Sequence, residues 1–592
     1  MTLMQVILSK GLGLPRAIAF IPLHVVILLL YGMVLTFPAI WPGSVFGDDT
    51  LSHLIMSRHF VDQLWAGDLY PRWLPGMNAG MGSPVFQFYG PVPYYITALF
   101  RPLLSHDPEG WHQLGLAASL AVMASGFMAH AWLKRLAGER AALVGAVLYM
   151  SAPYHLAVDL YQRFAFAELW GFVWMPLVML FARASMRGER GAMAGLSLSY
   201  ALLIMTHLPT TLLFSWVPIA YVLWMAESGD RLGAFVRVAG GMLLGMGLSA
   251  IYLLPAMTTQ EYVFIESLGD FFYRHHFLFN DPYKSAIIET ISHRVGLIAL
   301  TTAGLAVLAM LIGGLGQTRS HARERLFWGT AGTVIVFMML PVSEPVWSFI
   351  PLLQAVQFPW RFNTVLLIAC ASLVTLALTA LFHSERKFQA ALLLSAAFGL
   401  LIPSVMALGN HLVLARDIGQ PSLDNLIERF GTDHAELVMR LNATKSSRYD
   451  SFLPRWAPRE QLEPSRFMAA SQALFGAAPD VTQGSAKIRV TRWQPSHIEL
   501  AVKTDIDAPI KLHQYFYPGW VARLDNGSKR LEVRPSRPDG LLEVRVPPGM
   551  HRVRIEREAL PEERAGQIIS IASLVLLGAV LLGWPRRSDS VT

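Results

Sequence analysis

Long apolar runs recur along this chain, and most of them are flanked by short clusters of basic residues. Windows such as 17–40, 114–133 and 364–382 carry almost no charge, and they reach the length that an α-helix needs to cross a lipid bilayer. The pattern predicts twelve membrane-spanning helices. They are expected at residues 17–39, 112–133, 141–158, 166–184, 191–208, 209–226, 233–254, 295–316, 325–341, 362–383, 387–407 and 565–584.

Seven basic clusters indicate how these helices are oriented. Lys and Arg gather on the cytoplasmic side of membrane proteins, so placing every cluster there puts both chain ends in the cytoplasm. Three long segments then lie outside, at residues 41–111, 255–294 and about 410–564. The clusters are Lys10/Arg16, Lys134/Arg135/Arg140, Arg183/Arg187/Arg190, Arg231/Arg237, Arg319/Arg323/Arg325, Arg386/Lys387 and Arg586/Arg587.

The third outside segment has a different pattern. Leu542, Val544 and Val546 alternate with Glu543 and Arg545, the period of a half-buried β-strand. Strands are predicted at 488–493, 497–502, 512–517, 541–546 and 553–555. The predicted organisation is a transmembrane domain (1–410), a periplasmic domain (411–564) and a final transmembrane helix with a cytoplasmic tail (565–592). The periplasmic domain divides into a mixed part (411–480) and a β-sandwich at about 485–557.

Composition strengthens the membrane assignment. Of 592 residues, 53% are hydrophobic and 15% are charged, whereas soluble proteins carry about 25% charged residues. The net charge of +7 belongs largely to the predicted helix ends, which argues against nucleic acid as a partner. The single cysteine, Cys370, excludes an internal disulfide and a cysteine-based metal cluster.

The first outside loop holds most of the candidate chemistry. Asp48 and Asp49 follow the first predicted helix, and His53 comes one helical turn after Asp49. Asp49 would cap a helix beginning at Thr50 well, but adjacent carboxylates also suit proton transfer. Both interpretations stay open on spacing alone, and a metal ion, if bound, would use Asp48, Asp49 and His53.

Several motifs extend this loop and recur later in the chain. The loop itself contains Gly-Asp-Leu-Tyr-Pro-Arg-Trp at 67–73 and Gly-Ser-Pro-Val-Phe-Gln-Phe-Tyr-Gly-Pro at 82–91. Three further motifs occur later in the chain: Tyr161-Gln162-Arg163 with Glu168, Phe-Pro-Trp-Arg-Phe at 358–362 and Phe-Tyr-Pro-Gly-Trp at 516–520. Together they resemble the GT-C superfamily of multi-span glycosyltransferases, which use polyprenyl-phosphate sugars. The residues of these motifs are most similar to those of a bacterial branch identified as 6-pyruvoyl-tetrahydropterin synthase-related membrane proteins. Despite that name, the sequence shows no soluble pterin-synthase fold and no three-histidine zinc site.

The resemblance implies a GT-C-like fold and an inverting sugar transfer outside a bacterial cytoplasmic (inner) membrane. The donor would be a polyprenyl-phosphate-linked sugar, and the acceptor a periplasmic or cell-surface glycan or lipid. Asp49 would act as general base, with Asp48 as alternative base or as ligand of a divalent cation. Arg72 and Arg361, each restricted by Trp and Pro neighbours, would hold the donor phosphate. The remaining candidates for the substrate cavity are His53, Arg163, Glu168, Tyr89, Glu261, His275 and His276.

Structural alternatives exist for these residues and for the function. Arg163 and Glu168 would also fit a structural ion pair, and the loop that carries Glu261, His275 and His276 would also fit a solvated surface. Twelve helices with both ends inside suit a transporter or lipid flippase as well, and an inactive scaffold for envelope assembly would keep the same architecture. Few ionisable residues inside the predicted helices and no repeated halves argue against transport.

Overall fold

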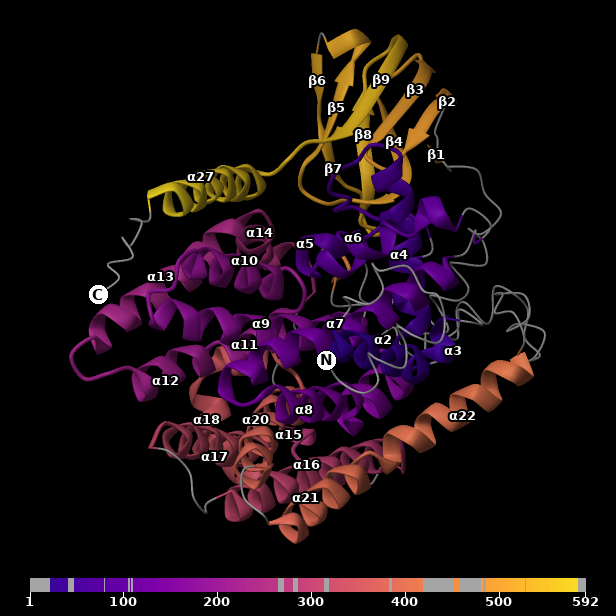
Figure 1. Cartoon of the computed structure of the whole chain (residues 1–592). Coiled ribbons are helices and arrows are strands. Elements are labelled where there is room, and N and C mark those ends of the chain that lie inside the picture. Colours follow the sequence, from indigo (N-terminus) through magenta and orange to yellow (C-terminus); the bar gives the residue numbers. More distant parts are fainter. Residues whose placement is uncertain are drawn as a thin grey trace, which may run out of the picture.

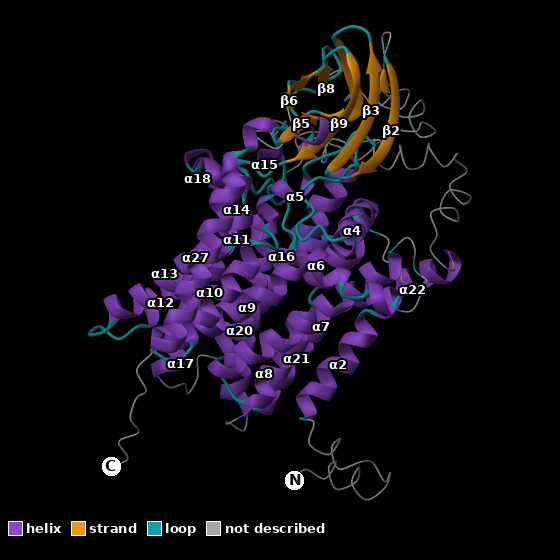
Figure 2. Ribbon diagram, turned by 90° about the horizontal axis from the view of Figure 1, so that it is seen from above, coloured by secondary structure: helices purple, strands orange, loops and turns teal. Residues whose placement is uncertain are grey.

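A bundle of long helices with a β-sheet domain over one end makes up the molecule (Figure 1). The computed structural model describes residues 22–40, 47–78, 80–104, 107, 110–264, 271–280, 286–313, 319–382, 386–418, 452–457, 481–482, 486–527 and 529–583. Figure 2 shows the strands gathered above the helices as two curved layers. The chain is therefore a polytopic α-helical membrane protein with a separate β domain.

The helices follow one another in a simple order along the chain. From the N-terminus they are α2 (Leu23–Leu35), α3 (Phe37–Ile40), α4 (Thr50–Trp65), α5 (Val85–Phe88), α6 (Val92–Ala98), η2 (Arg101–Leu103), α7 (Trp111–Leu136), α8 (Glu139–Ser151), η3 (Tyr154–Gln162), α9 (Phe166–Met186), α10 (Ala192–Ile204), α11 (Leu208–Phe214), α12 (Trp216–Met225), α13 (Arg231–Leu248), α14 (Ala250–Thr258), η4 (Gln260–Tyr262), α15 (Phe271–His275), α16 (Ala286–Ile312), α17 (Arg319–Met339), η6 (Pro341–Ser343), α18 (Glu344–Phe349), α19 (Pro351–Gln354), η7 (Pro359–Phe362), α20 (Asn363–Phe382), α21 (Lys387–Leu400), α22 (Ile402–Ile418) and α27 (Pro561–Gly583).

Nine helices in the described part of the chain are long and apolar enough to cross a membrane. A pair bent by 88°, His321–Met339 with Pro341–Phe349, raises the number to ten if it is one span. Two shorter apolar helices, Leu23–Leu35 and Ala192–Ile204, lie where two further spans are predicted. Each of the twelve predicted helices therefore has a counterpart, but the structure gives membrane-spanning length to nine or ten.

Turns that carry the predicted basic clusters meet at one end of the bundle, called here the basic end. Arg135 at the end of α7 lies 3.4 Å from Glu189, which precedes α10. Arg237 of α13 donates hydrogen bonds to carbonyl oxygens at the end of α9, and Arg323 of α17 donates to the carbonyl of Trp224 in α12. The first cluster (Lys10/Arg16) and the last (Arg586/Arg587) lie outside the described residues. These contacts therefore test the position of clusters between those two only.

The β domain consists of two antiparallel sheets that share one apolar core. The strand orders are β1-β4-β8-β7 and β2-β3-β9-β5-β6, and Leu500, Leu512, Val544 and Ile555 come from both sheets into the same cluster. The strands are β1 (Val481–Thr482), β2 (Lys487–Gln494), β3 (His497–Thr504), β4 (Ala508–Tyr515), β5 (Trp520–Leu524), β6 (Lys529–Leu531), β7 (Val533–Pro535), β8 (Leu541–Val546) and β9 (Gly549–Arg557).

The alternation pattern predicted five of these strands and missed the others. The predicted runs fall on β2, β3, β4, β8 and β9. β5 has no polar alternation because four of its five residues are buried, and β1, β6 and β7 are too short to show a period. Most of the predicted mixed part, 411–480, lies outside the described residues, although α22 continues past residue 410 to Ile418.

A tryptophan from the first loop fixes the β domain to the helices. The indole Nε1 of Trp73 donates to Gln514 Oε1 at 2.9 Å, and the Gln514 amide donates to the carbonyl of Gly80 at 2.7 Å. Gly82 has φ +85°, and a Cβ there would lie 2.2 Å from the Trp73 ring. Glycine at 82 therefore supplies both the left-handed turn and the space that the indole occupies.

The end of the β domain leads directly into α27, which packs against α13 and α14 (Figure 1). Ser570 accepts a hydrogen bond from the Ile251 backbone N–H at 2.8 Å. A Cβ on Gly566 would lie 2.4 Å from the carbonyl oxygen of Ala250. Small residues allow helix backbones to approach closely in a membrane, so α27 is a packed member of the bundle.

We predict that the basic end and the β domain lie on opposite sides of the membrane. In a Cys370→Ala background, single cysteines replacing Leu69, Glu261 or Arg530 should react with an impermeant thiol reagent on intact cells. Leu69 is 79% exposed and Cys370 is fully buried, so accessibility depends on membrane side and not on packing.

Cysteines replacing Arg190 and Glu227, both exposed at the basic end, serve as controls and should react only after the cells are permeabilised. Labelling of these two in intact cells, together with protection of the first three, would invert the orientation. Labelling of all five would contradict a membrane barrier between the two ends.

Candidate functional site

The backbone of the Asp48–Asp49 segment is bound to the end of η3. The Asp48 N–H donates to the carbonyl oxygen of Gln162 at 2.9 Å, and the Asp49 N–H donates to that of Arg163 at 2.7 Å. A Cβ on Gly47 would lie 2.6 Å from the backbone nitrogen of Phe164. Glycine at 47 is therefore what allows the backbone of this segment to lie against residues 162–164.

Asp49 occupies the N-cap position of α4, as its spacing predicts, but its side chain makes no capping hydrogen bond. The Asp49 carbonyl accepts the His53 N–H at 3.0 Å. The turn is closed instead by Thr50, whose hydroxyl accepts the Gly47 N–H at 2.8 Å. The half-buried Asp49 carboxylate is therefore not used for capping, while Asp48 is exposed.

Glu168 lies at the centre of a buried ion-pair network next to this segment. Its Oε2 lies 3.1 Å from Arg163 Nη1 and 3.2 Å from Arg361 Nε, and its Oε1 accepts a hydrogen bond from the Tyr154 hydroxyl at 2.8 Å. Asp159 adds a second carboxylate 3.0 Å from Arg163 Nη1. The predicted Arg163–Glu168 pair is present, and Arg361 joins it from the distant η7 segment.

Both arginines keep hydrogen-bonding capacity beyond this network. Arg361 also donates through Nη1 to the carbonyl of Val356 at 2.7 Å. The Nη2 atoms of Arg163 and Arg361 have no hydrogen-bond partner among the described residues. Each guanidinium lies over an aromatic ring, Arg163 at 4.9 Å from the centroid of Trp360 and Arg361 at 4.8 Å from that of Phe358. The pair can therefore offer two planar cations to an anionic group.

The backbone around these arginines adopts conformations that most residues avoid. Phe164 follows Arg163 with φ +52°, and Gln357 lies four residues before Arg361 with φ +70°. η3, which carries Asp159, is a π-helix, a form found mostly at functional sites. Non-glycine residues with positive φ store strain that persists only where the surroundings impose it, which marks this region as a candidate site.

His53 lies on the first turn of α4 among aromatic rings. Its Nδ1 is 2.7 Å from the Tyr94 hydroxyl, and the ring centroids of Tyr89, Phe164 and Phe166 lie within about 6 Å. In the part of the chain that the structure describes, Asp48, Asp49 and His53 do not bring three ligand atoms within the 4.8 Å that a shared metal ion needs.

Tyr89 comes from the first loop and faces both the Asp49 segment and the ion-pair network. Burial raises the pKa of its hydroxyl, and the charge of Asp49 raises it further. The hydroxyl therefore stays protonated at neutral pH and can donate a hydrogen bond beside Asp49.

Arg72 belongs to a different set of contacts from Arg361. It donates to Gln87 Oε1 at 3.1 Å and to the carbonyl of Ile251 at 2.7 Å, and its Nε lies 3.8 Å from Glu563 at the start of α27. Its guanidinium also lies 3.9 Å from the ring centroid of Tyr70. Arg72 is 4% exposed, and all three of its nitrogens have partners, so it connects the first loop to α14 and α27.

The second loop contributes one of its three candidates to this region. His276 packs its ring edge-on against Phe358 at 4.7 Å, next to Arg361. His275 ends the short helix α15. Glu261 lies exposed on η4, where its carbonyl accepts a hydrogen bond from Arg455 at 3.4 Å. The second loop thus borders the site through His276 and contacts residues 452–457 through Glu261.

Sequence reasoning missed two members of the network, Asp159 and Tyr154. Asp159 is fully buried, and its Oδ2 has no hydrogen-bond partner among the described residues. The spacing of Asp159 and Arg163, four residues apart, is the signal that could have revealed the pair. An acid inside an apolar segment is also a functional candidate in a membrane protein by default.

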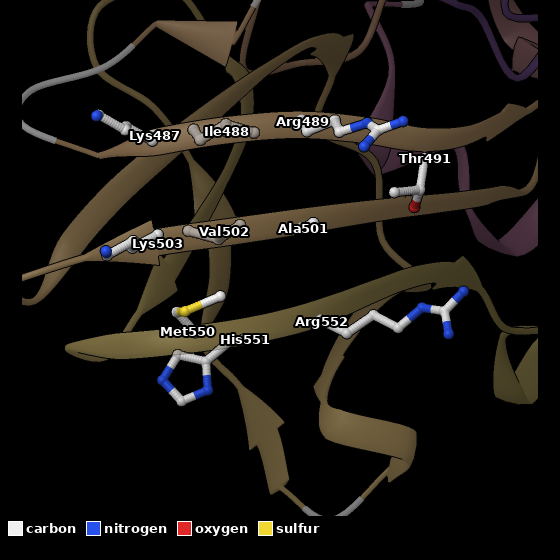
Figure 3. Close-up of a pocket in the computed structure, with 10 residues that line it drawn as sticks. All are labelled: Lys487, Ile488, Arg489, Thr491, Ala501, Val502, Lys503, Met550, His551 and Arg552. Carbon is white, nitrogen blue, oxygen red and sulfur yellow. The ribbon is translucent and has the colours of Figure 1, made fainter.

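A hollow of about 520 Å³ lies on the five-stranded sheet of the β domain, away from the ion-pair network. Figure 3 shows Lys487 and Arg489 of β2, Lys503 of β3 and Arg552 of β9 around it, with Met550 of β9 beside Lys503. Lys487 and Lys503 are direct cross-strand partners, an arrangement that is unfavourable for like charges. The hollow is therefore a concentrated positive surface.

One family model matches more than half of this chain. The family is described as "6-pyruvoyl-tetrahydropterin synthase related domain; membrane protein", and the match covers residues 86–410. This range contains Tyr89, Arg163, Glu168 and Arg361 but not the Asp48–Asp49 segment. A comparison with curated proteins finds no match.

Solved structures of three membrane proteins are similar to parts of this chain. Arabinofuranosyltransferase AftD from Mycobacteria is 16% identical, with 65% of this chain and 26% of that protein covered and a TM-score of 0.41. ArnT from Cupriavidus metallidurans, bound to undecaprenyl phosphate, is 15% identical, with 76% of each chain covered and a TM-score of 0.40. The oligosaccharyltransferase AglB from Archaeoglobus fulgidus, with an inhibitory peptide and a dolichol-phosphate, is 15% identical, with 66% and 56% covered and a TM-score of 0.35. This chain thus spans about a quarter of the length of AftD.

Proposed function

The chain belongs to the membrane-protein family described as 6-pyruvoyl-tetrahydropterin synthase related, and from this premise we propose that it is a membrane glycosyltransferase. It moves a sugar from a polyprenyl-phosphate donor to a glycan or lipid acceptor on the outer side of a bacterial cytoplasmic membrane. The observation that carries the proposal is that the Asp49 backbone is hydrogen-bonded to Arg163, whose buried guanidinium Glu168 joins to Arg361. The resemblance of the loop motifs to GT-C enzymes agrees with it.

Asp49 serves as the general base in this reaction. The acceptor hydroxyl loses its proton to the Asp49 carboxylate as its oxygen forms a bond to the anomeric carbon. The bond from that carbon to the phosphate oxygen breaks on the opposite face, and the polyprenyl phosphate leaves with the electron pair, so the configuration inverts. A carboxylate within hydrogen-bond range of the acceptor hydroxyl can take up this proton.

Arg163 and Arg361 bind the donor phosphate in this proposal. Glu168 fixes both guanidinium groups, and the Nη2 atom of each is available for a phosphate oxygen. Planar, charge-assisted hydrogen bonds of this kind stabilise the charge that develops on a departing phosphate. Arg72 takes no part in phosphate binding here because Gln87, the Ile251 carbonyl and Glu563 already occupy its nitrogens.

The basic hollow on the β domain receives anionic groups of the acceptor. Lys487, Arg489 and Lys503 have no acidic partner among the described residues, and the facing pair Lys487 and Lys503 gains stability when an anion lies between them. The same domain is fixed to the first loop through Trp73 and Gln514. An acceptor held there would be anchored to the element that also carries Asp49.

We predict that Asp49→Asn lowers the transfer rate by about 10²–10⁴-fold, because an amide cannot accept the acceptor's proton. The assay follows the release of radiolabelled sugar from a panel of polyprenyl-phosphate sugars by the purified protein. Asn caps a helix about as well as Asp, so folding should be unchanged. Asp48→Asn is the matched control and should retain most of the activity.

Equal losses in both variants, with a rate that depends on divalent cations, would replace the base with a shared metal site. Full activity in both variants would make the loop acids structural. A transporter, a lipid flippase or an inactive scaffold would then be the better assignment.

We predict that Arg361→Ala weakens binding of a polyprenyl-phosphate donor by about 10- to 100-fold, since a hydrogen bond to a charged group contributes ~1.5–3 kcal/mol. Arg361→Lys should restore part of the affinity, because lysine keeps the charge and lacks the planar fork. Equilibrium binding of a radiolabelled polyprenyl-phosphate donor to the purified protein measures the dissociation constant.

Arg72→Lys serves as the comparison and should leave donor affinity close to that of the wild type, because the nitrogens of Arg72 contact Gln87, the Ile251 carbonyl and Glu563. A larger loss from Arg72→Lys than from Arg361→Lys would move the phosphate site to Arg72. Unchanged affinity in Arg361→Ala would remove Arg361 from the site.

We predict that the double variant Lys487→Glu/Lys503→Glu raises the KM for an anionic acceptor by about tenfold, since each exposed charge pair contributes up to ~1 kcal/mol. Donor affinity should not change, because the ion-pair network is elsewhere in the molecule. Lys529→Glu on β6 is the control, because it makes the same change of charge at an exposed position outside the hollow. An unchanged acceptor KM in the double variant would exclude the hollow from acceptor binding.

A further inference from the structure

A cluster of two histidines and a glutamate lies at the basic end, where three helices meet. His24 is the second residue of α2, His130 lies in the last two turns of α7, and Glu139 is the first residue of α8. One ligand atom from each lies within 4.8 Å of the other two. The cluster belongs to the opposite end of the bundle from the Asp48–Asp49 segment, because α8 and η3 together form a 24-residue span between them, about 36 Å long.

The spacing of these ligand atoms matches a four-coordinate ion. His24 Nδ1 lies 3.0 Å and His130 Nε2 lies 3.3 Å from the same oxygen, Glu139 Oε1. Zinc binds imidazole nitrogen and carboxylate oxygen at about 2.0–2.2 Å, and tetrahedral geometry then separates neighbouring ligand atoms by about 3.3 Å.

The surroundings point to a ligand in the same place. His130 is 5% exposed, and its Nε2 makes no hydrogen bond of normal geometry among the described residues although Glu139 Oε1 lies 3.3 Å away, so a ligand at this nitrogen would satisfy it. The rings of His24 and His130 are stacked, with centroids 4.4 Å apart. Stacked rings direct their in-plane lone pairs side by side, so both imidazoles would turn toward a shared ion on binding it, whereas two protonated imidazoles would repel each other and Lys134.

Lys134 supports the carboxylate from its other side. Its Nζ lies 2.5 Å from Glu139 Oε2, so Oε1 is left facing the two imidazoles. Hydrogen bonds of this kind orient metal-bound carboxylates and are common around metal sites. His24 and Glu139 are 25% and 44% exposed, which leaves room for water as a fourth ligand.

We propose that His24, His130 and Glu139 bind one divalent transition-metal ion of the zinc type, which fastens the start of α2 to the turn between α7 and α8. Two imidazoles with one carboxylate favour zinc over magnesium or calcium, which prefer oxygen ligands. The site ties together the first described helix and the α8–η3 span that carries Asp159. It is independent of the proposed transferase activity.

The test uses the full chain, purified in detergent through an affinity tag without histidine and stripped of metal with EDTA. Titration with Co²⁺ alone should give the visible absorption bands of a four-coordinate cobalt site at one ion per chain, and Zn²⁺ should abolish them. His24→Gln and His130→Gln should each weaken Co²⁺ binding by more than about 100-fold, because loss of a supporting residue alone costs roughly 10–100-fold. His411→Gln, which changes a histidine of α22 that packs on Tyr161, should bind Co²⁺ like the wild type.

Thermal unfolding separates loss of the ion from loss of the fold. Zn²⁺ should raise the Tm of the wild type and not that of His24→Gln, while the two metal-free proteins should unfold at similar temperatures because His24 lies at a partly exposed helix start. Absence of saturable Co²⁺ binding to the wild type would overturn the proposal. Equal binding by the His24→Gln/His130→Gln double variant would overturn it as well.

Discussion

Glu168 bridges two arginines that lie far apart in the sequence, and the arrangement of the candidate site depends on this contact. A buried carboxylate and a buried guanidinium are each costly to remove from water. Here one carboxylate oxygen faces both Arg163 and Arg361, while Tyr154 satisfies the other oxygen. Because removal of any one member would leave an unpaired buried charge, the network holds η3, α9 and η7 in one relative position.

The first loop takes its position from that network. Its Gly47–Asp49 segment has backbone hydrogen bonds to residues 162 and 163, so the same arginine that pairs with Glu168 also places the loop carboxylates. The loop in turn carries Trp73 and the contacts to the β domain, and Arg72 connects it to α14 and α27. The buried ion-pair network therefore positions the first loop, and the first loop in turn positions the β domain and α27.

Charges inside this bundle occur in sets with matched partners. Arg183 in α9 contacts Glu324 of α17 and Tyr221 of α12 near the basic end, and these residues are buried like the Glu168 network. In a medium that offers little water, such groups persist only where other residues satisfy them. Asp159 Oδ2, Arg183 Nε and Glu324 Oε2 are exceptions, since each of these atoms is buried without a hydrogen-bond partner among the described residues.

The sequence by itself determined the class of molecule and the location of its elements. Apolar runs of spanning length and basic clusters predicted the helices, since both follow from the cost of exposing polar groups to lipid, and alternation predicted β2, β3, β4, β8 and β9. The motifs also selected Asp49, Arg163, Glu168 and Arg361 as candidates. Only the tertiary structure decided which of them meet: residue 361 reaches Glu168 across 193 positions of sequence, and Arg72 is taken up by α27 instead. Pairing at that separation depends on how the helices pack and on which carboxylate each buried cation can reach. A local sequence pattern contains no information about either, because both depend on contacts between distant segments.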